Sequence, residues 1–317
     1  MHLNDQSLTL VESLLSRADE RRVTVHQVEG GGRVIDCGIE APGGLLAGLD
    51  MARICLAGLA EVELVSGEVA RRPIPLVQVV TDHPALACLG SQYAGWALSE
   101  GKFFAMGSGP MRAAYAHEPV YSALGYREEA RAVVGVLEGR KRPPQAVVTK
   151  VAECCQVAPA DVTLLIAPTA SLAGGVQVVS RSVETALHKL HELGFDLKRI
   201  VSAHGTAPLP PVAESDLAAI GRTNDAMLYG ARVVLYVTGD DGSLADIGTR
   251  VPSSSSHDYG EPFSAIFSRY NHDFYAVDPL LFSPAEIVFQ NIETGRTHAF
   301  GQTAPGVLER SFFAGVA

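Results

Sequence analysis

The chain has 317 residues, of which 47% are apolar and 19% charged, so it is long enough and apolar enough to build two packed subdomains. Its formal net charge of −10 argues against a nucleic-acid or anionic-membrane partner, because both are bound through lysine and arginine. A local group of arginines in an acidic protein still allows an anionic small molecule as a ligand.

The first residues, MHLNDQSLTLVESLL, lack the basic segment, the uninterrupted apolar core and the small-residue cleavage site of a secretory signal. No stretch approaches the ~18 consecutive apolar residues that a membrane span requires. The cysteines are odd in number and show no C-x-x-C spacing, which favours reduced, mostly buried thiols. We therefore expect a cytoplasmic protein without a membrane partner.

Helical and strand patterns alternate in the first part of the chain. Apolar residues at helical spacing predict helices, and short β-branched runs between turn residues predict strands. The predicted helices are residues 5–17, 44–59, 84–99 and 128–138, and the predicted strands are residues 22–28, 33–35, 62–65 and 75–80.

A basic, proline-bearing stretch at residues 139–145 (GRKRPPQ) predicts a boundary between two subdomains, 1–140 and 141–317. Beyond it, helices are predicted at residues 144–155 and 176–193. Strands are predicted at residues 162–167, 200–203, 231–237, 274–277 and 286–291. Because helices and strands interleave throughout, we expect an α/β fold with α+β-like layering and two packed subdomains.

Familiar catalytic signatures do not occur in the sequence. It has no G-x-S-x-G, no G-x-x-x-x-G-K-[ST] and no H-E-x-x-H, and its histidines do not show zinc-ligand spacing. His188 and His191 form an i, i+3 pair on a predicted helix. An exposed helical pair is the favoured interpretation, since no third ligand lies close in sequence. We expect no metal site.

The segment APTASLAGGVQ at residues 167–177 follows an apolar strand and leads into a helix, which is how ligand sites are built at the carboxyl end of a strand. On that helix Arg181, Glu184, His188 and His191 form a polar stripe. Periodicity alone favours a solvated face, in which an Arg–Glu pair contributes about 0.3–0.5 kcal/mol.

Three other polar segments are rich in glycine, proline or small residues. Residues 106–112 (MGSGPMR) read as a turn, or as an anion or pterin cradle in which Arg112 takes part. Residues 221–225 (GRTND) and 251–263 (VPSSSSHDYGEPF) are predicted loops. Loops of this composition either hold a polar ligand or serve only as turns.

Nine short motifs follow one another along nearly the whole chain. They are DCG with GG (36–38, 43–44), ACLGSQYAGW (87–96), FAMGSGP (104–110), APTAS (167–171), RSVETALHK (181–189), GRTND (221–225), DYGEPF (258–263), FYAVDP (274–279) and FSPA (282–285). Each is weak alone, but in this order they resemble the methenyltetrahydromethanopterin cyclohydrolase family.

This resemblance implies two α/β domains with a deep cleft between them, association as a homotrimer, and no metal or prosthetic group. Family members interconvert 5,10-methenyl-tetrahydromethanopterin and its 5-formyl derivative, reversibly, with water. Their functional arginine and glutamate form an R-x-x-E on a helix, which falls here on Arg181 and Glu184. The resemblance therefore replaces the solvated-face interpretation with a catalytic one.

The implied substrate carries an electrophilic amidinium cation, so attack by water needs a general base but no covalent nucleophile. We expect Glu184 to be that base and Arg181 its partner. The expected pterin contacts are Gln92, Tyr93, Ser108, Arg112, Ser171, Thr223, Asn224 and Asp225. Two alternatives remain open: a cyclohydrolase acting on methenyl-tetrahydrofolate, and a non-catalytic pterin-binding protein.

Overall fold

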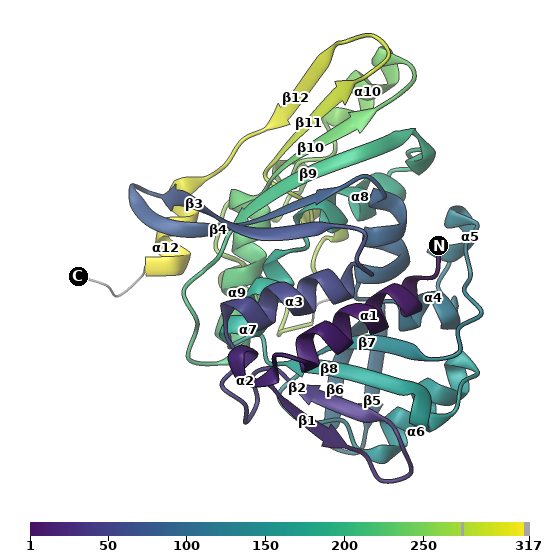
Figure 1. The fold of residues 1–317 in the computed structure, drawn as a ribbon. Helices are drawn as coiled ribbons and strands as arrows, with labels where there is room; N and C mark the ends of the chain where they lie inside the picture. Colours follow the sequence, from purple (N-terminus) through teal and green to yellow (C-terminus); the bar gives the residue numbers. More distant parts are fainter. Residues whose placement is uncertain (274–275, 314–317) are drawn as a thin grey trace. The chain divides into compact units, whose positions relative to one another are not determined.

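A computed structural model describes residues 1–273 and 276–313 and confirms the predicted α/β class (Figure 1). The chain divides into two compact units, residues 1–60 with 86–177, and residues 61–85 with the chain from 178 onward. The basic stretch 139–145 lies inside the first unit. These units therefore do not coincide with the division at residue 140 that the sequence suggests, because the chain enters and leaves the second unit through the segment 61–85.

The first unit is built on a mixed six-stranded sheet. Its strand order is β1-β2-β8-β7-β6-β5, with β2, β8 and β7 parallel to one another and the outer strands antiparallel. The central strands β7 and β8 are almost entirely buried, as expected for strands covered on both faces. The bounds are β1 Thr24–Gln27, β2 Arg33–Asp36, β5 Trp96–Glu100, β6 Phe103–Ser108, β7 Val133–Glu138 and β8 Val162–Ala167.

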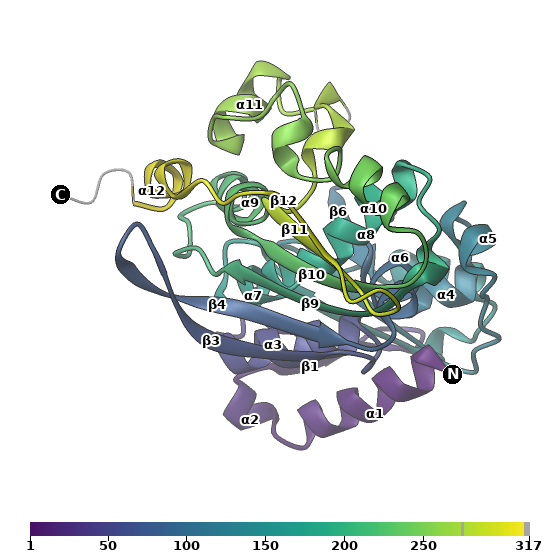
Figure 2. The same ribbon diagram turned by 90° about the horizontal axis from the view of Figure 1, so that it is seen from above.

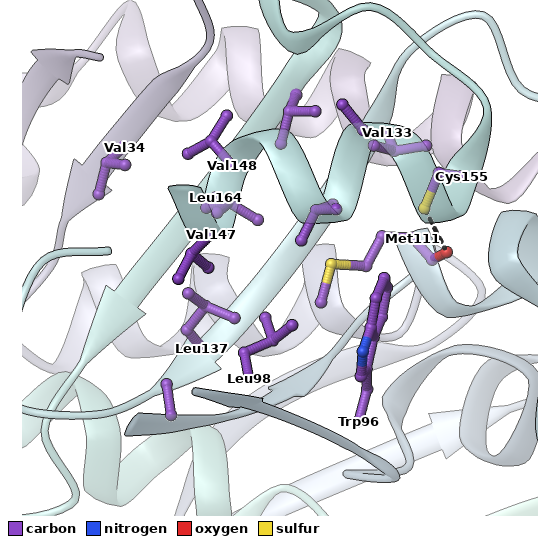
Figure 3. Close-up of a cluster of buried hydrophobic side chains, with 14 of the residues drawn as sticks. Val34, Trp96, Leu98, Met111, Val133, Leu137, Val147, Val148, Cys155 and Leu164 are labelled. Carbon is purple, nitrogen blue, oxygen red and sulfur yellow. Dashed lines mark hydrogen bonds between the residues drawn. The ribbon is translucent and has the colours of Figure 1, made fainter. Parts of the chain in front are cut away.

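Helices cover both faces of this sheet. On one face α6 (Gln145–Cys155) packs its valines on the strands, together with Trp96 and Met111, as Figure 3 shows. On the other face α1 (Leu3–Leu15) and α3 (Leu45–Cys55) form a second apolar cluster. The other described helices of this unit are α2 Ala18–Arg21, the π-helix η1 Ala85–Gln92, α4 Met111–Tyr115, α5 Val120–Leu124, η2 Pro159–Asp161 and most of α7 Leu172–Val179.

The second unit contains another six-stranded sheet, which twists from β3 at one edge to β12 at the other (Figure 2). Its order is β12-β11-β10-β9-β4-β3, and only β10 and β11 are parallel. The bounds are β3 Glu61–Val69, β4 Arg72–Thr81, β9 Ile200–Pro208, β10 Arg232–Val237, β11 Glu286–Asn291 and β12 Thr297–Gly301.

Helix α8 (Ser182–Glu192) packs against β9 and β10 through the fully buried Val183, Leu187 and Leu190, the apolar stripe expected from helical spacing. The other helices described in the second unit are η3 Leu197–Arg199, α9 Asp216–Asp225, the π-helix η4 Ala226–Gly230, α10 Asp241–Gly248, η5 Ser253–Ser255, α11 Phe263–Arg269, η7 Pro279–Leu281 and α12 Pro305–Phe313.

Most predicted elements are confirmed, but four predictions fail or need revision. The helix predicted over 128–138 is wrong: residues 133–138 form β7, whose continuous apolar run is buried on both faces. The helix predicted over 84–99 ends at Gln92, and β5 follows Gly95. The segment predicted as one helix over 176–193 forms parts of two helices, α7 (Leu172–Val179) and α8. Residues 221–225, predicted as a loop, are helical. The strand predicted over 274–277 lies partly outside the described residues.

All five cysteines are free thiols and all but Cys154 are buried, as predicted. Among the residues described, none of the helices combines the length and the apolar composition that a membrane-spanning segment requires.

Candidate active site

The Arg181–Glu184 pair lies at the start of α8, immediately after a break in the helical path. Helix α7 ends at Val179, and Arg181 occupies the N-cap position of α8 with φ −86° and ψ 11°. The Arg181 backbone N–H donates to the Val178 carbonyl at 3.2 Å, and its own carbonyl accepts from Thr185 N–H at 2.9 Å. The backbone around Arg181 is therefore held from both sides.

Both members of the pair are buried. The Arg181 Nη1 atom lies 3.6 Å from the Glu184 Oε2 atom, and the two side chains are only 9% and 7% exposed. This separation is that of an ion pair and exceeds a direct hydrogen bond. Glu184 also sits in the first turn of α8, where the helix dipole favours a carboxylate. The solvated face suggested by periodicity is thus wrong for these two residues.

The C-terminal half of the stripe differs from its beginning. His188 and His191 are half-buried, and His188 Nε2 lies 3.9 Å from Glu192 Oε1, an ordinary surface pair. On the buried side Lys189 donates to the Leu280 carbonyl and, at 3.4 Å, to the Ser255 hydroxyl. Burial lowers the pKa of Lys189 to about 8. These contacts attach α8 to the segments around η5 and η7.

Thr223, Asn224 and Asp225 occupy the last turn of α9. Thr223 and Asn224 donate from their side chains to the carbonyls of Ala219 and Ile220, four residues earlier in the helix. Asp225 is fully buried and accepts the backbone N–H of Phe263 at 2.7 Å. Burial raises the pKa of Asp225 to about 7, while Ser311 and Phe263 act in the opposite direction.

In the first unit, Arg112 on α4 is bound on several sides and almost fully buried. Its Nη1 atom donates to the carbonyls of Leu89 and Ser91, both at 3.1 Å, and its Nε donates to Glu118 Oε1 at 3.1 Å. Nη2 contacts the other Glu118 oxygen. The guanidinium also lies 5.0 Å from the centroid of the Tyr93 ring. Arg112 therefore binds carbonyls at the C-terminal end of η1, where the last carbonyls of a helix lie beyond its own N–H donors.

Ser108 belongs to a neighbouring buried polar group. Its hydroxyl donates to the Val136 carbonyl at 3.0 Å and lies 3.3 Å from the Cys55 thiol. Gln177 at the end of α7 donates to the same sulfur at 3.7 Å, and the Cys55 thiol in turn faces the carbonyl of Gln92 at 4.0 Å. The structure thus brings the predicted residues Gln92 and Ser108 together through a cysteine.

Ser171 lies elsewhere in the first unit, at the carboxyl edge of β8. Its hydroxyl donates to Pro168 O at 2.7 Å and accepts Gly174 N–H at 3.0 Å, so it caps α7. At the same edge the Thr169 hydroxyl donates to Glu138, the last residue of β7. The predicted ligand loop at the end of a strand is therefore an ordered helix start with a half-buried serine.

Four residues that the sequence analysis overlooked complete these groups: Cys55, Glu118, Gln177 and Lys189. Gln177 is the last residue of the APTASLAGGVQ segment, so its place in that predicted ligand segment was a signal that could have found it. Lys189 ends the motif RSVETALHK, which likewise offered a local signal, whereas Cys55 and Glu118 carry none, because each meets its partners only through tertiary packing. Among the described residues, no three His, Cys, Asp or Glu side chains gather closely enough to hold a metal ion.

Comparison with known proteins assigns the chain to a family. The family profile described as "Cyclohydrolase (MCH)" matches residues 2–312. A methenyltetrahydromethanopterin cyclohydrolase of Methylobacterium sp. (strain 4-46) is 46% identical over 315 residues, covering 98% of this chain and 97% of the relative. Relatives of the same name from Xanthobacter autotrophicus and Methanocorpusculum labreanum are 49% and 43% identical, covering 96% and 98% of this chain and 90% and 98% of their own lengths. The chain therefore belongs to the methenyltetrahydromethanopterin cyclohydrolase family.

Proposed function

We propose that the protein hydrolyses 5,10-methenyl-tetrahydromethanopterin to 5-formyl-tetrahydromethanopterin, reversibly, with Glu184 as the general base. Family membership supports the reaction class. The observation that carries the residue assignment is the buried pairing of Arg181 with Glu184 in the first turn of α8. A buried carboxylate held beside a guanidinium at a helix start supplies a general base together with an electrostatic partner for developing negative charge.

The hydrolysis requires only a positioned water and a general base from the protein, because the substrate itself is reactive. The methenyl carbon lies between two nitrogens that share a positive charge, so it is already electrophilic. A water placed about 3–3.5 Å from that carbon attacks it while Glu184 takes one of its protons. The bond from the carbon to N10 then breaks as N10 receives the proton from Glu184. The hydroxyl on the carbon releases its remaining proton to solvent, so the oxygen stays on the carbon as the 5-formyl group and one proton is set free overall.

Arg181 has a positioning and an electrostatic role in this scheme. Its guanidinium holds the Glu184 carboxylate at 3.6 Å, and it stabilises negative charge that develops on the attacking oxygen. The substrate cation has no need of an arginine for binding. Removing Arg181 should therefore affect turnover more than affinity.

The proposed pterin contacts fall into two classes according to their burial. Tyr93, Ser171 and Asn224 are only half-buried, so we assign direct ligand contact to them. The other five are buried and shape the surroundings of the ligand; these are Gln92, Ser108, Arg112, Thr223 and Asp225. We further propose, from the family resemblance, a metal-free homotrimer that works in the cytoplasm.

The test is the absorbance of the methenyl cation, followed after adding wild-type protein, Glu184→Gln or the control Glu192→Gln. Glu192 lies on the same helix but is exposed. We expect Glu184→Gln to lose about 10²-fold or more of kcat, and Glu192→Gln to stay within about threefold of wild type.

If Glu184→Gln kept wild-type turnover, Glu184 would not be the base. If the wild type itself left the methenyl signal unchanged, the protein would be a binding protein instead of an enzyme. A parallel assay with methenyl-tetrahydrofolate tests the substrate: faster turnover of the folate compound would contradict the methanopterin assignment.

A further inference from the structure

We infer that Gly205 in β9 is a positioning residue for the Arg181–Glu184 pair. The inference rests on the proposed function and concerns the contact between α8 and the sheet of the second unit. Gly205 lies in an interior strand, paired with Val79 of β4 and Val233 of β10. Glycine weakens the interior of a strand. A glycine at such a position often marks a place where another segment of the chain approaches closely.

Glycine is required at this position because the neighbouring side chains leave no room for a Cβ atom. Gly205 does not have the left-handed φ that favours glycine. A Cβ atom at Gly205 would lie 2.5 Å from Ser182 Oγ, 2.8 Å from Val183 Cγ2 and 3.2 Å from Ser182 Cβ. The first two distances are shorter than real Cβ contacts, so the first turn of α8 rests on the strand at this point.

The crowded atoms have no room to move aside. Ser182 and Val183 are both fully buried, and their side chains are too short to swing away as a lysine would. The Ser182 hydroxyl has no hydrogen-bond partner in the described part of the chain, so packing holds it in place. A methyl group at Gly205 therefore has to push the first turn of α8 outward.

The same turn carries the catalytic pair. Ser182 and Val183 are the two residues between Arg181 and Glu184, so a displacement of their backbone moves both charged side chains. Catalytic geometry is sensitive to such shifts, and a displacement of about 1 Å can reduce the rate about 100-fold. Gly205 thus acts on the reaction through the position of α8, without a role as a catalytic residue.

The test compares Gly205→Ala with the matched control Gly230→Ala in the same absorbance assay. A Cβ at Gly230 would be similarly crowded, at 2.6 Å from Pro208 Cγ, but it meets β9 and α12 instead of α8. We expect Gly205→Ala to lower kcat about 10- to 100-fold with KM changed less than about threefold. Gly230→Ala should lose stability and keep its kcat.

A second substitution tests the direction of the effect. Ser182→Gly removes two of the three crowded atoms, so the double variant Ser182→Gly with Gly205→Ala should recover at least about fivefold of the lost kcat. If Gly205→Ala does not fold, Ser182→Thr introduces the extra methyl from the helix side and should show the same loss of kcat.

The outcomes separate this inference from the proposed function. Equal kcat losses in Gly205→Ala and Gly230→Ala, or no recovery in the double variant, would overturn the positioning role while Glu184→Gln remains inactive. Wild-type turnover in Glu184→Gln would overturn the proposed function and this inference with it. A kcat loss confined to Gly205→Ala and relieved by Ser182→Gly supports both.

Discussion

The Arg181 guanidinium and the Glu184 carboxylate lie 3.6 Å apart inside the second unit, with less than a tenth of either side chain exposed. Taking two charges out of water is costly, and the cost is offset only while both partners are present. Removing one partner leaves a buried, uncompensated charge, which typically costs about 3–5 kcal/mol of stability. Variants of either residue therefore need a stability measurement beside the kinetic one.

Arg181→Ala is expected to lower kcat about 100-fold while KM stays within about threefold of wild type, because the guanidinium acts on Glu184 and on the attacking oxygen. Steady-state kinetics on the methenyl substrate checks this, with urea unfolding to confirm that the variant is folded at the assay temperature. Arg232→Ala, a substitution of an arginine whose side chain is 62% exposed, serves as the control and should leave both constants unchanged. A raised KM at unchanged kcat would mean that Arg181 binds substrate.

Sequence patterns predicted the bounds of helices and strands best where an element has one exposed face or is flanked by turn residues. Strands β8 and β11 were predicted with the bounds that the structure shows, since turn residues flank each. Strand β7, like β8, is buried on both faces and has no alternation to reveal it, but no turn residue stands directly before β7, so its apolar run was joined to the preceding residues as a helix. The break between α7 and α8 was missed because apolar spacing continues across Ser180 and Arg181.

The candidate site shows a different limit. Periodicity placed Arg181 and Glu184 on a solvated face, because spacing along a helix does not tell which other segments will cover that face. Only the resemblance of the R-x-x-E motif to a known family indicated a catalytic role. Gly205 could not have been linked to this pair from sequence, since 20 or more residues separate it from Ser182 and Val183, and β9 reaches them only in the folded chain.

Arg112→Ala should destabilise the protein by about 3 kcal/mol, because it leaves the Leu89 and Ser91 carbonyls and the Glu118 carboxylate without their shared partner. Thermal and urea unfolding measure this loss. Arg127→Ala, on an exposed arginine of the same unit, should be neutral within about 0.5 kcal/mol. Unchanged stability with a raised KM would show instead that Arg112 is available to the ligand and contacts it directly.

Asp225→Asn is expected to change how stability depends on pH. Burial raises the pKa of Asp225 to about 7 in the folded protein, whereas the pKa of an aspartate in an unfolded chain is about 3.9. Between these values the folded state keeps a proton that the unfolded state has lost, so the wild type loses stability as the pH rises from about 4 to about 7. Three pH units correspond to at most about 4 kcal/mol.

An asparagine cannot titrate, and its carbonyl oxygen can still accept the Phe263 N–H. We therefore expect urea unfolding at pH 5 and pH 8 to show that the free energy of unfolding of the wild type falls from pH 5 to pH 8 by more than that of Asp225→Asn. Glu214→Gln, an exposed carboxyl in the segment before α9, should follow the wild type at both pH values. If the free energies of unfolding of wild type and Asp225→Asn changed in parallel between pH 5 and pH 8, Asp225 would be ionised in the folded protein. The positive charge of Arg310 and the hydrogen bonds from Phe263 and Ser311 would then outweigh the effect of burial.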